Sequence, residues 1–117
     1  LVSPADATES EPCDAQPEEL DVAYAVHYLE EATTLKVTSV AHKWAGLRTF
    51  APDRLPVVGF DKDQPAFFWL AGQGGYGIQS SPALGQYAAS LLGNEPVGEN
   101  LHVAALSGQE FQPQRFA

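Results

Sequence analysis

The first part of the chain passes from a polar stretch into a mixed apolar pattern. Residues 6–19 are rich in Asp, Glu, Pro, Ser and Thr, which predicts a solvated loop. Pro17, Glu18 and Glu19 then favour a helix start, because proline suits the first turn and carboxylates favour the positive end of the helix dipole. Apolar side chains follow at spacings of three and four over about fourteen residues, so the pattern predicts a helix here.

The middle of the chain has the composition of short strands. The segments 35–41 and 44–50 carry β-branched, apolar and aromatic residues, and Gly46 kinks the second of them. The segments 56–60 and 67–70 are almost wholly apolar and are joined by a short polar turn. This spacing suggests that they form a hairpin or neighbouring strands of one sheet.

A glycine-rich turn, GQGGYG at 72–77, separates the last strand from a second predicted helix. Glycine at so many positions excludes a regular element. Ser80 and Ser81 followed by Pro82 predict the N-terminus of this helix, and Gly93 predicts its end. One face of the predicted helix is apolar and comprises Leu84, Tyr87, Ala88, Leu91 and Leu92.

The elements together predict an α+β chain of two helices and about four short strands. The strand–helix–strand alternation of a complete nucleotide-binding domain is missing from this pattern. Residues after Pro96 have little periodicity, and we expect 106–116 to be a surface tail that packs loosely or against a partner.

Composition and charge exclude several kinds of protein. The net charge is −9, with only six Lys and Arg, so we expect no nucleic-acid partner and no anionic membrane surface. No apolar run is long enough for a membrane span. Cys13 is the only cysteine, so we expect no metal site and a reducing, cytoplasmic setting. The chain opens on Leu1 and contains no methionine, so we expect an upstream portion; a trimmed start is the alternative.

The glycine turn is the first candidate site. Glycines let the backbone approach a flat or anionic group, and the following helix start offers N–H donors to an electron-rich edge. Gly72, Gly74 and Gly77 have the spacing of a dinucleotide-phosphate fingerprint, but such a lone match is weak. A phosphate site, another electron-rich ligand and a purely structural turn all stay open at this point.

Three motifs follow one another along the chain: WAGLR at 44–48, PDRLPVVG at 52–59 and GQGGYGI at 72–78. Their order and spacing resemble the C-terminal region of the D-amino-acid oxidase and glycine oxidase family of FAD-dependent oxidoreductases. The resemblance spans roughly residues 43–92. It implies a C-terminal fragment in which 1–60 belong to the substrate domain, 61–93 complete the FAD-binding domain and 94–117 form a tail.

The resemblance also implies the site. In that family the turn before the last helix lies at the pyrimidine edge of the flavin, where backbone N–H groups stabilise charge that develops at N1 and O2. Arg48 corresponds to the arginine that binds the substrate carboxylate, and Tyr76 either lines the substrate pocket or packs on the turn. No dedicated catalytic residue is expected, because hydride transfer from a neutral amine needs none. The implied cofactor-binding residues are Gly74, Gly75, Tyr76, Gly77, Ile78 and Gln79.

The implied function is oxidation of amino acids or related amines by hydride transfer to FAD. The chain departs from the family in lacking the upstream dinucleotide-binding motif and a second arginine in the glycine turn, and Gln73 stands where a histidine is common. We therefore expect FAD in a full-length parent, but neither cofactor retention nor activity in this fragment. The alternative is a self-contained small α+β binding or regulatory module without enzymatic activity.

A fragment of a larger fold exposes surfaces that the remainder would cover. We therefore expect the chain to self-associate through apolar surfaces. The candidates for these surfaces are Phe67, Phe68, Trp69 and the helical face of Leu84, Tyr87 and Leu91.

Overall fold

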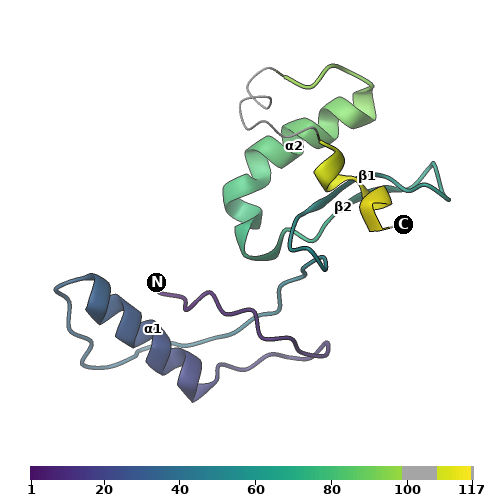
Figure 1. The fold of residues 1–117 in the computed structure, drawn as a ribbon. Coiled ribbons are helices and arrows are strands. Elements are labelled where there is room, and N and C mark those ends of the chain that lie inside the picture. Colours follow the sequence, from purple (N-terminus) through teal and green to yellow (C-terminus); the bar gives the residue numbers. More distant parts are fainter. Residues whose placement is uncertain (99–107, 117) are drawn as a thin grey trace. The chain divides into compact units, whose positions relative to one another are not determined.

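A computed structural model describes residues 1–98 and 108–116 (Figure 1). The chain divides into two compact units, Leu1–Leu47 and Arg48–Ala117, which are described separately. The described residues form a small α+β fragment, in which the regular elements are two α-helices, one two-stranded antiparallel sheet and short 3₁₀ turns.

The first unit contains helix α1, Glu19–Ala32, which confirms the helix predicted after Pro17. Acidic residues occupy its first turn, where they complement the helix dipole. The helix ends at Thr33, whose hydroxyl donates a hydrogen bond of 2.8 Å to the carbonyl of Leu29. None of its residues is buried, so the apolar side chains of α1 cover no core within the described residues.

The prediction of strands at 35–41 and 44–50 is wrong. Neither segment forms a strand, and the second contributes only one isolated antiparallel bridge, between Phe50 and Gln73. A strand requires hydrogen-bonded neighbours and a face to bury. The described residues give Leu35, Val40 and Trp44 no such cover, since all three are exposed.

The second unit is built on a hairpin, as the two apolar segments predicted. Strand β1, Val57–Phe60, pairs antiparallel with strand β2, Phe68–Ala71. The connecting turn is fixed by Asp61, whose carboxylate accepts hydrogen bonds of 2.9 Å from the backbone N–H groups of Asp63 and Gln64. The paired residues are Val57 with Ala71, Val58 with Leu70, Gly59 with Trp69, and Phe60 with Phe68.

Helix α2, Gly77–Gly93, begins earlier than the sequence predicted. A 3₁₀ turn at Gly74–Tyr76 leads directly into it, so the predicted start at Ser80 and Ser81 is wrong. Pro82 lies inside the helix and has no N–H to donate to the carbonyl of Ile78. The Ser81 hydroxyl donates to that carbonyl instead, at 2.9 Å, which explains how the helix tolerates the proline.

The end of α2 is displaced by one residue from the prediction. Gly93 is still helical, and Asn94 takes the left-handed conformation, with φ of 51°. Asparagine is one of the few residues that adopt this conformation readily. The N–H of Glu95 donates to the carbonyl of Ser90 at 2.9 Å and so satisfies an acceptor of the last turn.

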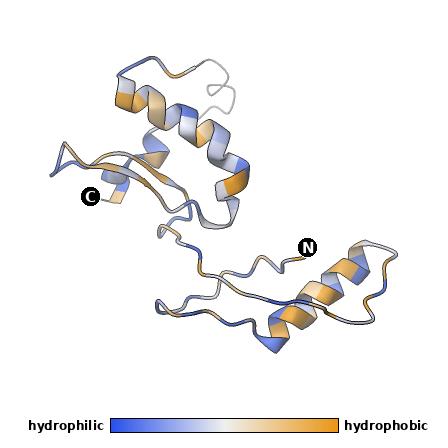
Figure 2. Cartoon of the chain, turned by 180° about the vertical axis from the view of Figure 1, so that it is seen from behind, coloured by the Kyte–Doolittle hydropathy of each residue, from blue (hydrophilic) through white to orange (hydrophobic). Residues whose placement is uncertain are grey.

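The core of the second unit is small. Val58 of β1 is fully buried and packs with Leu84 and Ala88 of α2, and Figure 2 shows apolar residues in both the hairpin and α2. The predicted apolar face of α2 is therefore used within this chain rather than left open, except for Leu92, which is exposed. The residues packed around this core are Phe68, Tyr87, Leu91 and Phe111.

Residues 108–116 were predicted as a loose surface tail, and this is wrong. They form two 3₁₀ turns, Gln109–Phe111 and Pro113–Phe116, which contact β1. The Tyr87 hydroxyl donates to the carbonyl of Gly108 at 3.1 Å, and the Gln114 amide donates to the carbonyl of Phe60 at 2.9 Å. The rest of the region after Gly98, at 99–107 and 117, lies outside the described residues.

An ion pair ties this C-terminal segment to the turn before β1. Arg115 donates to both carboxylate oxygens of Asp53, at 2.6 and 3.1 Å, and to the carbonyl of Leu55 at 2.9 Å. These hydrogen bonds from Arg115 lower the pKa of the Asp53 carboxyl. The pair therefore stabilises the fold above the ordinary carboxyl pKa near 4, and the stabilisation is lost as the pH falls below it.

We expect Asp53→Asn to flatten the acid limb of the stability curve of the second unit. The variant cannot gain the stability that Asp53 adds as its carboxyl loses its proton, a gain that is complete once the pH is above the ordinary carboxyl pKa near 4. Urea unfolding at a series of pH values measures this dependence. Asp63→Asn is the matched control, because Asp63 forms no ion pair within residues 1–98 and 108–116. An acid limb of equal slope in both variants and the parent chain would contradict the assignment.

Candidate functional site

The glycine turn adopts a conformation that requires glycine. Gly72 and Gly74 have positive φ values of 68° and 53°, a region that residues with a Cβ rarely occupy. Space is also restricted, because a Cβ on Gly74 would lie 2.5 Å from Cε1 of Phe50. The turn can therefore keep this shape only with glycine at these positions.

The chain segment that follows the WAGLR motif lies along this turn. The N–H of Gly74 donates to the carbonyl of Thr49 at 3.0 Å, and Phe50 pairs with Gln73 in the isolated bridge. Within the turn, the N–H of Tyr76 donates to the carbonyl of Gln73 at 3.1 Å. Two motifs separated in the sequence thus meet in one site.

Arg48 lies against the turn. A Cβ on Gly75 would lie 2.9 Å from one terminal nitrogen of the Arg48 guanidinium, so the end of this exposed side chain lies close to the backbone of Gly75. Within residues 1–98 and 108–116, Arg48 forms no ion pair. Lys36, Lys43 and Arg115, by contrast, each pair with an acid. On a chain of net charge −9, Arg48 thus presents beside the glycine turn a cation that no acid of the described residues pairs with.

The start of α2 is open to solvent. Its N-terminus has no side-chain cap, and the first N–H groups of an α-helix lack intrahelical acceptors. Tyr76 is 67% exposed and Ile78 is 96% exposed, although both carry large apolar surfaces. Tyr76, Ile78 and Arg48 are therefore exposed near the positive N-terminal end of α2, whereas the N–H groups of Gly74 and Tyr76 already donate within the chain.

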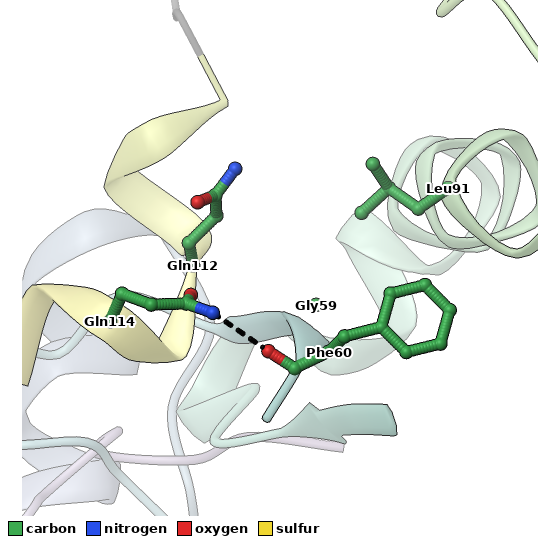
Figure 3. Close-up of a pocket in the computed structure, with 5 residues that line it drawn as sticks. All are labelled: Gly59, Phe60, Leu91, Gln112 and Gln114. Atoms are coloured by element: carbon green, nitrogen blue, oxygen red, sulfur yellow. Dashed lines mark hydrogen bonds between the residues drawn. The ribbon is translucent and has the colours of Figure 1, made fainter. Parts of the chain in front are cut away.

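A separate cavity lies elsewhere in the second unit. It has a volume of about 180 Å³ and lies between β1, α2 and the C-terminal segment (Figure 3). It contains none of the predicted site residues, so the glycine turn and this cavity are distinct features. The residues that line it are Gly59, Phe60, Leu91, Gln112 and Gln114.

The described residues hold no cluster of three or more His, Cys, Asp or Glu side chains suited to a metal ion. Among the same residues, no helix is long and apolar enough to cross a membrane.

The chain matches the FAD dependent oxidoreductase family over residues 4–91. This match covers most of the chain, including α1, the glycine turn and nearly all of α2, so the chain belongs to this family of flavoproteins. This membership favours an FAD-dependent oxidoreductase over a self-contained binding module.

One similar protein is a tRNA 5-methylaminomethyl-2-thiouridine biosynthesis bifunctional protein, MnmC, from Delftia acidovorans (strain DSM 14801 / SPH-1). The two sequences are 37% identical over 68 residues, which cover 57% of this chain and 10% of the relative. The chain thus matches about a tenth of the length of this curated relative.

Sequence reasoning missed the part that Phe50 plays in this site. Its ring contacts the α-carbon region of Gly74, and its backbone pairs with Gln73. The only sequence signal is its position two residues after Arg48, which does not by itself reveal a contact with a distant turn.

Proposed function

We propose that this chain is the C-terminal part of an FAD-dependent oxidoreductase that oxidises amino acids or related amines. The observation that carries the proposal is the guanidinium of Arg48, which lies beside Gly75 near the open start of α2 and forms no ion pair within residues 1–98 and 108–116. A carboxylate needs a cation of this kind, and an electron-rich ring edge needs backbone donors of this kind.

The turn fits the edge of a flavin. Ile78 and Gln79 expose the first turn of α2, while the ring of Phe50 and the guanidinium of Arg48 lie against the backbone of Gly74 and Gly75. When bound, the flavin of such an enzyme accepts a hydride from the carbon beside the substrate nitrogen. The residues Gly74 to Gln79 would hold its pyrimidine edge, and the N–H groups of α2, with the helix dipole, stabilise negative charge there.

Arg48 would bind and orient the substrate. A guanidinium forms two parallel hydrogen bonds with a carboxylate, which fixes the direction of the bond to be broken. Tyr76 is exposed and follows Gly75, against which Arg48 lies, so Tyr76 would cover the substrate from one side. No side chain of this chain needs to accept a proton in the oxidation of a neutral amine.

We propose that the isolated chain does not retain FAD, because the open face supplies only one wall of a site. Visible absorption spectra of the purified 117-residue chain and of the complete flavoprotein test this directly. We expect a yellow complete protein and a colourless isolated chain. A bound flavin on the isolated chain contradicts the one-wall proposal, whereas a complete protein without flavin contradicts the proposed function.

A second candidate substrate is an amine carried on a tRNA nucleoside. The similarity to a protein named for tRNA 5-methylaminomethyl-2-thiouridine biosynthesis favours it. The net charge of −9 argues against contact between this chain and RNA phosphates, which favours a free amino acid or amine. Flavin reduction with free glycine, with other amino acids and with tRNA separates the two substrates, since only the accepted one bleaches the flavin.

We further propose that the isolated chain self-associates through the hairpin. Phe67 and Trp69 are 51% and 38% exposed and their rings contact each other at 4.9 Å between centroids, while Leu70, 47% exposed, lies on the other face of β2. Light scattering over a concentration series measures the mass, and Trp69→Lys is expected to reduce association. A monodisperse monomer at every concentration would contradict this proposal.

A further inference from the structure

The ring of Phe50 lies so close to Gly74 that no side chain would fit on the backbone at that position. A Cβ on Gly74 would lie 2.5, 2.8 and 3.3 Å from Cε1, Cδ1 and Cζ of its ring. The ring is half-buried, and the guanidinium of Arg54 lies 5.9 Å from its centroid. The ring of Phe50 thus lies close both to Gly74 and to a cation.

The contacts around Phe50 form an ordered series of three. Arg48 lies against Gly75, the carbonyl of Thr49 accepts from the N–H of Gly74, and Phe50 pairs with Gln73. The two segments therefore run antiparallel, residue against residue. The ring of Phe50 adds the side-chain contact that fixes how closely they approach.

We propose that Phe50 is a positioning residue that sets the distance between Arg48 and the start of α2. This inference rests on the proposed function, in which Arg48 holds the substrate and the turn holds the flavin edge. Transfer between two bound groups depends steeply on their separation, and an error of about 1 Å can cost about 100-fold in rate. The ring of Phe50 lies against Gly74, so in this proposal it acts through the turn.

The test compares Phe50→Ala, Phe50→Leu and Phe67→Ala in the complete flavoprotein, with rates expressed per bound flavin. We expect Phe50→Ala to lower kcat by about 10- to 100-fold and to change KM less than about threefold, because Arg48 remains available to the carboxylate. Phe50→Leu keeps part of the contact and should lie between Phe50→Ala and the parent. Phe67→Ala alters an exposed phenylalanine of the same unit and should leave kcat unchanged.

A purely structural role gives a different result. It lowers the yield of folded protein but leaves kcat per bound flavin at the parent value, and that outcome overturns the proposal. If Phe50→Ala does not fold, Phe50→Leu decides by the same criterion. A parent protein that binds no flavin or oxidises no amine overturns the proposed function itself, whereas an active parent with unaffected Phe50 variants overturns only the positioning role.

A double-mutant cycle tests the contact independently. Gly74→Ala places its methyl group in the ring of Phe50, so its effect on kcat should be smaller in the Phe50→Ala background than in the parent. Equal effects in both backgrounds would show that the ring does not set the position of the turn, and would overturn the proposal.

Discussion

Replacement of Arg48 by alanine in the complete flavoprotein is expected to lower kcat/KM for carboxylated substrates by roughly 30- to 700-fold. This range corresponds to about 2–4 kcal/mol for the loss of one partner of a close charge pair. The flavin should remain bound, because the backbone at Gly74 to Gln79, and not the guanidinium, would hold its edge. Steady-state kinetics and flavin absorbance of the same preparation measure both effects.

Controls separate this role from a general effect of charge. Arg48→Lys keeps the charge but loses the two parallel donors, so only a small part of the rate should return. Lys62→Ala removes another exposed cation of the second unit and should have little effect. An equal loss of kcat/KM with an amine that has no carboxylate would show that Arg48 does not recognise that group.

Leu84→Ala is expected to destabilise the second unit by about 2–4 kcal/mol, because it leaves a cavity beside Val58. The core contains few fully buried side chains, and a small domain has little stability in reserve. We therefore expect this one substitution to unfold a large share of the molecules. Urea unfolding followed by circular dichroism of α2 measures the change.

Leu92→Ala is the matched control for Leu84→Ala. Leu92 lies on the same helix and undergoes the same chemical change, but it is 58% exposed. Its loss should cost less than about 0.5 kcal/mol. Similar losses at both positions would contradict the assignment of Leu84 to the core.

The sequence predicted the elements whose stability is mainly local. The carboxylates after Pro17 mark the start of α1, and the two apolar segments around Asp61 form the hairpin. The strand predicted at 35–41 failed because a strand depends on a partner that composition cannot supply. The prediction of a helix start at Ser81 and Pro82 was wrong. A serine before a proline is typical of a helix start, but here the Ser81 hydroxyl donates to the carbonyl of Ile78 in place of the N–H that Pro82 lacks.

The sequence predicted only part of the candidate site, because some of its contacts join segments far apart in the chain. The spacing of motifs pointed to Arg48 and to the glycine turn, and the two do lie together. Phe50 was not predicted, because its contact with Gly74 depends on the approach of two segments more than twenty residues apart. The packing of residues 108–116 was equally hidden, since their composition is that of a polar tail.

The packing of residues 108–116 sets the C-terminal boundary of the second unit. The family match ends at residue 91, yet Phe111 packs against the core and Arg115 holds the turn at Asp53. A boundary drawn at the end of the match would remove both side chains and the two 3₁₀ turns that contact β1. A shortened protein made for crystallisation or labelling should therefore retain residues up to at least 116, with any tag separated from Phe116 by a flexible linker.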